Sequence, residues 1–430
     1  MCQSSSHGHH HHGRHHSHRS QPHQKHAPAH HHVDDSSRLT RRQALGRLKA
    51  AGLVAAASAS PWSSVVRAVT DDKQAAPAAG AATRLFDFKQ VAPGIFGAIA
   101  RPTAMLNCNA AVIVNRDHVL VVDTHSKPSA AKALIRQIRE EVTELPVRYV
   151  VDSHLHGDHA MGNEAYPEVF GASVEVISSV KTREWLEKLG LLRMQETLDF
   201  LPKQIAEFRA KREASRDEAV RAELATHIEG LEAYLKEMRP ARVTLPTMTF
   251  DNRLVIHRGG REIHLLFLGR AHTAGDVVAY IPSERAVATG DLMHGLLPYM
   301  RDGFPEEWPA TLRALEALDF DRVIPGHGSI QEGKGVLAQF RAYVEEITEK
   351  VSRGIEKGQT LDELKKTITV DTLASLKAGD AAGRVEREIT TLFPRPDRAP
   401  KPVEDSVRSN IGEVFTYFKE RKGRREMPLK

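Results

Sequence analysis

The sequence has few cysteines, no long apolar run and no strong excess of charge of either sign. Only two of its 430 residues are cysteines, Cys2 and Cys108, so no disulfide framework is implied. The formal net charge of +5 is small for this length and gives no concentrated basic face, which argues against nucleic acid as a partner. No glycine-rich phosphate loop and no internal repeat occurs. The hydrophobic content of 41% is nevertheless enough for a sizeable core.

The N-terminal segment is dominated by histidine. Residues 1–32 hold 13 of the 24 histidines, interleaved with Ser, Gly, Arg and Gln. No apolar periodicity occurs there, so we expect residues 1–38 to form a disordered leader. Because neutral imidazole binds zinc, copper and nickel, this leader could collect metal. A solvated low-complexity segment and an over-extended start site are the alternatives.

A short basic and apolar segment follows the leader. Arg41 and Arg42 precede a mildly apolar, alanine-rich run that is too short to span a bilayer. On these features residues 39–68 resemble a twin-arginine export signal, which implies a bacterial, periplasmic protein with no stable membrane span. A basic amphipathic helix is the alternative. Residues 69–83 are then expected to be an Ala/Pro/Gly linker.

One stretch concentrates possible metal ligands, namely His154-Leu155-His156-Gly157-Asp158-His159. The β-branched run that ends at Asp152 predicts a buried strand just before it. The stretch is therefore expected on a loop that leaves the end of a strand, where open α/β sheets place their chemistry.

Three further candidate ligands, His272, Asp291 and His327, also follow predicted strands. Asp123 ends another apolar run, Val119 to Val122. Strands and helical stripes alternate from residue 84 to 330, which predicts a domain of the α/β class.

Two helical regions accompany this domain. Residues 179–240 are charged, with apolar residues at helical spacing, and predict an antiparallel helical hairpin inserted into the domain. Ser215 and Glu218 match a capping box at the start of its second helix. The hairpin could be a lid over the site, a homodimer seam or an insertion that packs on itself. Residues 331–430 predict a helical C-terminal extension, with a capping box at Thr360 and Glu363.

The H-x-H-x-D-H stretch, followed in order by His272, Asp291 and His327, resembles the signature of the metallo-β-lactamase superfamily. The resemblance covers residues 84–330 outside the 179–240 insertion. It implies a four-layer αββα sandwich of two mixed β-sheets, here with a helical insertion and a helical C-terminal extension.

The resemblance also implies the roles of the residues in a two-metal site. One metal ion would be bound by His154, His156 and His272, and the other by Asp158, His159 and His327, with Asp291 bridging both. Two Zn²⁺ ions are expected, although iron or manganese also tolerates imidazole and carboxylate ligands. Asp123 and Thr273 are expected to orient ligands. The residues expected to touch substrate are His125, His294 and Tyr299.

The resemblance implies a hydrolase acting on a small molecule. A metal-bridging hydroxide would attack an ester, thioester, lactone or lactam carbonyl, with Asp158 as the catalytic residue that orients it. Asp291 at the bridging position resembles the glyoxalase II and lactonase-like branches, whereas true β-lactamases usually have Cys or Ser there. The alternatives are a β-lactamase proper, a mononuclear iron oxygenase of the same fold and a non-catalytic metal-binding protein.

Overall fold

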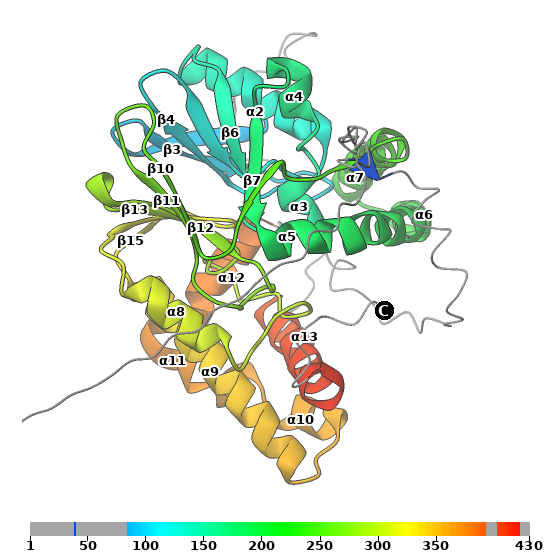
Figure 1. The fold of residues 1–430 in the computed structure, drawn as a ribbon. Helices are drawn as coiled ribbons and strands as arrows, with labels where there is room; N and C mark the ends of the chain where they lie inside the picture. Colours follow the sequence, from blue (N-terminus) through cyan, green and yellow to red (C-terminus); the bar gives the residue numbers. More distant parts are fainter. Residues whose placement is uncertain (1–37, 40–83, 393–401, 422–430) are drawn as a thin grey trace, which may run out of the picture. The chain divides into compact units, whose positions relative to one another are not determined.

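The computed structural model describes residues 38–39, 84–392 and 402–421 (Figure 1). The predicted leader, export signal and linker lie outside the described residues, apart from the two-residue strand β1 (Arg38–Leu39), which pairs with β8 (Val243–Thr244). Within the described part of the chain, the structure has no helix with the length and hydropathy needed to cross a membrane.

Two mixed β-sheets form the centre of the structure. In the first sheet the strand order is β2-β3-β4-β5-β6-β7-β9, with antiparallel pairing up to β5 and parallel pairing from β5 to β9. Its strands are β2 (Phe86–Ala92), β3 (Ile95–Ala100), β4 (Ala110–Val114), β5 (Val119–Val122), β6 (Val147–Val151), β7 (Glu175–Ser179) and β9 (Met248–Phe250).

In the second sheet the strand order is β10-β11-β12-β13-β14-β15, and only the β13–β14 pair is parallel. Its strands are β10 (Arg253–Ile256), β11 (Ile263–Phe267), β12 (Val277–Ile281), β13 (Ala286–Gly290), β14 (Arg322–Pro325) and β15 (Gln331–Glu332).

The period of two along the strands explains how the layers stack. In β5, Leu120 and Val122 join the apolar core between the two sheets, whereas Val119 and Val121 face the helices on the other side. Helices α2 (Pro128–Glu141) and α4 (Ala165–Phe170) cover this outer face, and α8 (Trp308–Glu316) and α9 (Gly335–Glu356) cover the outer face of the second sheet (Figure 1). The structure therefore confirms the expected helix–sheet–sheet–helix layering of an α/β fold.

The region of the predicted insertion contains helices from Val180 to Met238. They are α5 (Val180–Trp185), the π-helix η2 (Leu186–Gly190), α6 (Leu191–Ala214) and α7 (Glu218–Met238). The apolar stripes of α6 and α7 face each other in one core, together with Leu155 and Met161 from the metal-loop region. The predicted capping box at Ser215 is wrong, because Asp217 is the N-cap of α7 and accepts bonds from the amides of Ala219 and Val220. The dimer through this hairpin stays a prediction.

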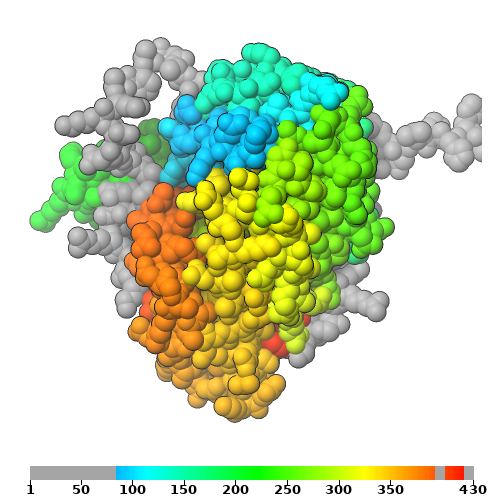
Figure 2. Space-filling model, turned by 90° about the vertical axis from the view of Figure 1, so that its left-hand side faces the viewer, coloured from blue at the N-terminus to red at the C-terminus, as the bar shows by residue number. Residues whose placement is uncertain are grey.

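The C-terminal part of the chain is helical. After α9 come α10 (Leu361–Thr367), α11 (Ala374–Lys377), α12 (Ala381–Leu392), α13 (Pro402–Thr416) and the π-helix η6 (Tyr417–Arg421), with short 3₁₀ turns at η4 (Val370–Thr372) and η5 (Ala378–Asp380). Another 3₁₀ turn, η3 (Pro282–Glu284), joins β12 to β13 in the second sheet. The capping box at Thr360 and Glu363 is confirmed. Figure 2 shows the yellow and orange residues of this region beside the green residues of the second sheet.

Candidate metal centre

The predicted ligands lie on loops at the ends of strands. The loops after β6, β11, β13 and β14 carry them: His154, His156, Asp158 and His159 after β6, His272 after β11, Asp291 after β13 and His327 after β14. The β6 loop turns at once into the short helix α3 (Gly157–Ala160), with His156 as its N-cap. Because strands of the two packed sheets end at the same edge, residues far apart in the sequence meet there.

Three imidazoles form a first group of ligand atoms. The Nδ1 atom of His156 lies 3.1 Å from Nε2 of His154 and 2.9 Å from Nε2 of His272. Two nitrogen ligands of a tetrahedral zinc ion, each at about 2.0–2.1 Å, are separated by roughly 3.3 Å. The spacing of these three nitrogens therefore fits a single metal ion, and together they form one of the groups able to hold one.

A second group lies beside the first and contains Asp158, His159 and His327. The Nε2 atom of His327 is 3.1 Å from Oδ2 of Asp158 and 3.3 Å from Nε2 of His159. Asp291 lies between the groups, with its Oδ2 atom 3.7 Å from Nε2 of His272 and 3.5 Å from Nε2 of His327. The structure thus brings all seven predicted ligands together, and His154, His159 and Asp291 form a further group that spans both sets.

The first group has the protonation state that a metal ion needs. Burial, with the neighbouring ring of His156, lowers the pKa of His272 to about 3. Burial also holds the pKa of His154 well below its ordinary value. Both rings are therefore neutral at pH 7, and each offers a lone pair at its inward nitrogen.

The second group attracts a cation. Burial opposes charge on His327, yet Asp291 and Asp158 raise its pKa to about 9. Burial likewise opposes ionisation of Asp158, but His159 and His327 lower its pKa to about 2. The Oδ1 atom of Asp291 is buried, makes no hydrogen bond among the described residues and lies 3.5 Å from Nε2 of His159. A buried carboxylate oxygen this close to an imidazole nitrogen, without a hydrogen bond of its own, fits a bound cation.

Each imidazole of the β6 and β11 loops uses its outward nitrogen for a second contact. The pairs are His154 Nδ1 with Ser153 Oγ (2.9 Å), His156 Nε2 with Asp302 Oδ2 (2.9 Å), His159 Nδ1 with Asp123 Oδ2 (2.8 Å) and His272 Nδ1 with the Tyr299 carbonyl (3.0 Å). Such contacts fix the tautomer and the orientation of a metal-binding histidine.

The two residues expected to orient ligands differ in what they do. Asp123 contacts His159 as expected and also accepts hydrogen bonds from the amide and hydroxyl of Ser153. Thr273 instead donates its hydroxyl to Asp276 at 2.6 Å and shapes the turn after His272. Sequence proximity to a ligand explains the expectation for Thr273, but its side chain completes a local turn.

The three residues expected to touch substrate are mostly enclosed. His125 is 0% exposed, stacks on Phe86 and lies with Nδ1 3.1 Å from the carbonyl of Cys108, which favours a packing role. His294 is buried, and its Nδ1 accepts a bond from the Leu296 amide. Tyr299 is half-buried, with its ring 5.8 Å from that of His156. Of the three, Tyr299 alone combines partial exposure with a ligand contact, through its carbonyl.

Sequence reasoning missed Ser153 and Asp302. Ser153 directly precedes the first ligand, so its position was a usable signal, whereas Asp302 lies 146 residues from His156 and no motif marks it. Cys108 is buried near this region, in a group with Asp123 and His159, and burial raises its pKa to about 12, so the thiol is protonated.

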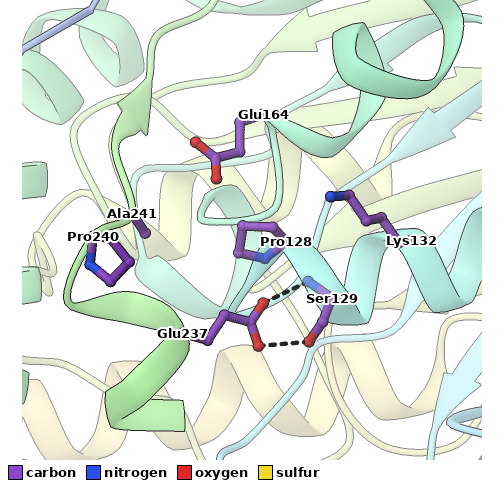
Figure 3. Close-up of a pocket in the computed structure, with 7 residues that line it drawn as sticks. All are labelled: Pro128, Ser129, Lys132, Glu164, Glu237, Pro240 and Ala241. Carbon is purple, nitrogen blue, oxygen red and sulfur yellow. Dashed lines mark hydrogen bonds between the residues drawn. The ribbon is translucent and has the colours of Figure 1, made fainter. Parts of the chain in front are cut away.

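A separate cavity of about 350 Å³ lies where the end of α7 meets the start of α2 (Figure 3). Two of its charged side chains are already paired: Glu237 accepts bonds from the amide and hydroxyl of Ser129, and Lys132 lies 2.6 Å from Glu168. None of its lining residues belongs to the two ligand groups. This cavity therefore marks a junction between the helical hairpin and the rest of the fold.

Comparisons with known proteins agree with this picture. The family model described as the metallo-beta-lactamase superfamily matches residues 104–327. The metallo-beta-lactamase IND-1 of Chryseobacterium indologenes is 33% identical over 81 residues, which are 17% of this chain and 34% of that protein, so the chain matches only about a third of the relative's length.

Two solved structures align with this chain. A metallo-beta-lactamase from Pontibacter korlensis aligns with a TM-score of 0.43 and 17% identity, over 60% of this chain and 99% of that one. The stereoselective inverting sec-alkylsulfatase Pisa1 from Pseudomonas sp. aligns with a TM-score of 0.53 and 15% identity, over 78% of this chain and 50% of that one. The second alignment supports a shared fold.

Proposed function

The chain belongs to the metallo-beta-lactamase superfamily, and we propose that it is a hydrolase that uses two zinc ions. The observation that carries the proposal is the meeting of seven side chains in two adjacent groups, with Asp291 within 3.7 Å of a nitrogen in each. His154, His156 and His272 would hold one ion, and Asp158, His159 and His327 the other. Zinc accepts this mixture of imidazole and carboxylate donors.

When bound, the two ions would lower the pKa of a water molecule and polarise the oxygen of the scissile group. The protein's own contribution is to hold its ligands rigidly. Most of these side chains are buried, whereas those of His156 and Asp158 keep 16% and 14% of their surface exposed. Substrate would therefore approach from the edge formed by these two residues.

Asp158 is the proposed catalytic residue. Its Oδ2 atom faces Nε2 of His327, and its pKa of about 2 keeps the carboxylate ionised at neutral pH. An ionised carboxylate at the open edge of the site can accept a hydrogen bond from the attacking water and so orient it. The proton that the attacking water loses can then pass by way of this carboxylate to the leaving group of the substrate.

The resemblance supports a substrate class. Asp291 at the proposed bridging position resembles the glyoxalase II and lactonase-like branches, which favours an ester, thioester or lactone over a β-lactam. Sulfate esters join the candidates, because the fold shared with the alkylsulfatase Pisa1 extends over 78% of this chain. The panel of substrates to test therefore contains lactones, thioesters, β-lactams and alkyl sulfates.

Metal content tests the proposal most directly. A chain shortened to begin near Thr83 removes the histidine-rich leader, so that metal bound there does not enter the count. We expect elemental analysis to give about two zinc ions per chain and hydrolysis of at least one member of the panel. One iron per chain with oxygen uptake would instead identify an oxygenase. Metal-free chains after zinc supplementation would contradict the proposal.

A further inference from the structure

His156 is held differently from the other imidazoles of its group. His154 and His272 present Nε2 to the group and use Nδ1 for their outward contacts, whereas His156 presents Nδ1 and points Nε2 outward. It also has the more exposed side chain, with 16% of its surface accessible, against 0% for His272. Its orientation therefore depends strongly on what its outward nitrogen contacts.

That contact is a bridging carboxylate. Asp302 is buried, and its Oδ2 atom lies 2.9 Å from Nε2 of His156. Its other oxygen, Oδ1, accepts a hydrogen bond from Nη2 of Arg193 at 3.1 Å. Because Nδ1 of His156 must be unprotonated to bind a metal, Nε2 carries the proton and donates it to Asp302.

Arg193 belongs to the helical hairpin. It is the third residue of α6, and its second terminal nitrogen, Nη1, faces Glu196 on the next turn at 3.4 Å. The arginine is thus fixed on a helix and directed at Asp302. A continuous path of hydrogen bonds leads from the hairpin to a candidate metal ligand.

We propose that Asp302 and Arg193 are positioning residues for His156. Through Arg193, the helical hairpin would then help to orient a ligand of the metal centre. The proposal deepens the function proposed above and rests on it. Asp302 selects the tautomer and fixes the ring plane of His156. Arg193 holds the carboxylate in place and, together with Arg301, offsets its charge. Loss of either contact frees the half-open ring and weakens metal binding without removing a ligand.

The test compares metal affinity in the full-length chain. The variants are Asp302→Asn, Arg193→Met and Arg193→Lys, each titrated with Zn²⁺ in competition with a chromophoric chelator. All of them carry the same histidine-rich leader, so differences between them report the folded site. Substitution with Co²⁺ adds an absorption spectrum that is sensitive to ligand geometry.

We expect Asp302→Asn to weaken metal binding by about 10–100-fold, the usual loss for a residue that orients a ligand, and Arg193→Met by about tenfold. Both should change the Co²⁺ spectrum. Arg193→Lys should recover part of the affinity, because a single N–H···O bond joins Arg193 to Asp302. Equal losses in Arg193→Met and Arg193→Lys would overturn the role of Arg193.

Two controls separate positioning from general stabilisation of the hairpin. Arg209, also on α6, pairs with Glu232 of α7 at 2.5 Å, so Arg209→Met removes an ion pair within the hairpin. Glu237→Gln weakens the contact with Ser129 at the α2 junction (Figure 3). Both controls should leave the affinity and the Co²⁺ spectrum unchanged. If they alter these as much as Arg193→Met does, the hairpin acts only through stability and the proposal fails.

Failure of the positioning role and failure of the proposed function give different results. If the wild-type chain binds zinc tightly and Asp302→Asn binds it equally well, Asp302 and Arg193 do not position His156, and the hydrolase proposal stands. If the zinc affinities of the variants fall in the expected order but the wild-type chain hydrolyses nothing in the panel, the positioning role stands and the hydrolase proposal fails. A wild-type chain whose folded part binds no metal overturns both.

Discussion

The Nε2 atom of His272 lies 2.9 Å from Nδ1 of His156, although 116 residues separate the two in sequence. That interval includes the whole helical hairpin as well as strands of both sheets. The contact exists because the loops after β6 and β11 open at the same edge of the packed sheets. It is the closest approach among the ligand nitrogens described above, and it joins the two sheets within one group of ligands.

Replacement of the shared carboxylate is expected to affect both ligand groups. Asp291 lies within 3.7 Å of His272 in one group and 3.5 Å of His327 in the other. Asp291→Ala should lower metal content and turnover together, by more than the ~10–100-fold typical of residues that only orient ligands. Elemental analysis and rate measurements check this, with the exposed Asp251→Ala as control. Full metal content and full activity in Asp291→Ala would contradict the two-metal site.

A glycine beside the site should tolerate no side chain. A Cβ atom at Gly326 would collide with Oδ1 of Asp291 and lie 2.8 Å from the carbonyl carbon of Gly290. Gly326→Ala should therefore displace Asp291 and reduce metal affinity, although no ligand is removed. Gly333 has open space around it and a positive φ, so Gly333→Asn is a milder control. Competition with a chelator measures the zinc affinity of both variants. Equal affinity in Gly326→Ala and Gly333→Asn would show that the loop carrying Asp291 can move to accommodate the added methyl group.

The hairpin should lose stability in mildly acidic solution. His227 on α7 is half-buried against Phe208, and burial lowers its pKa to about 4. In the unfolded chain the pKa is about 6.5, so between these values the unfolded state binds more protons. The free energy of unfolding should therefore fall as the pH drops from about 6.5 to about 4. Below pH 4, His227 should cause no further loss.

Thermal denaturation of wild type and His227→Gln at several pH values checks the prediction. Between pH 6.5 and pH 4 the stability of the variant should fall less than that of the wild type. Other buried histidines contribute equally to both proteins. Parallel curves for the two proteins over this range would show that His227 is not responsible.

Export remains a proposal based on the sequence. A reporter protein fused after Ala68 should appear in the periplasm of a bacterial host when Arg41 and Arg42 are intact. Replacement of both arginines by lysine should keep it in the cytoplasm, because the twin-arginine pathway reads the paired guanidinium groups. Cell fractionation provides the readout, and undiminished export of the double variant would contradict the proposal.

The sequence by itself determined the strands, the ligand residues and their order. A β-branched run before a dense cluster of ligands specifies a strand and a loop locally, and the alternation in β5 specifies two covered faces. The resemblance carried by His154 to His159, with His272, Asp291 and His327, was enough to identify residues that the structure brings together. Local signals also located the Thr360 capping box.

Only the tertiary structure decided how the ligands are oriented. Ser153 and Asp123 lie near ligands in sequence or in a known motif, but Asp302 and Arg193 come from distant segments that no local pattern connects. Thr273 shows the converse, since it follows a ligand and yet bonds to Asp276. A hydrogen bond between side chains depends on where packed elements place them, so short-range periodicity can predict the elements but not the contacts that join them.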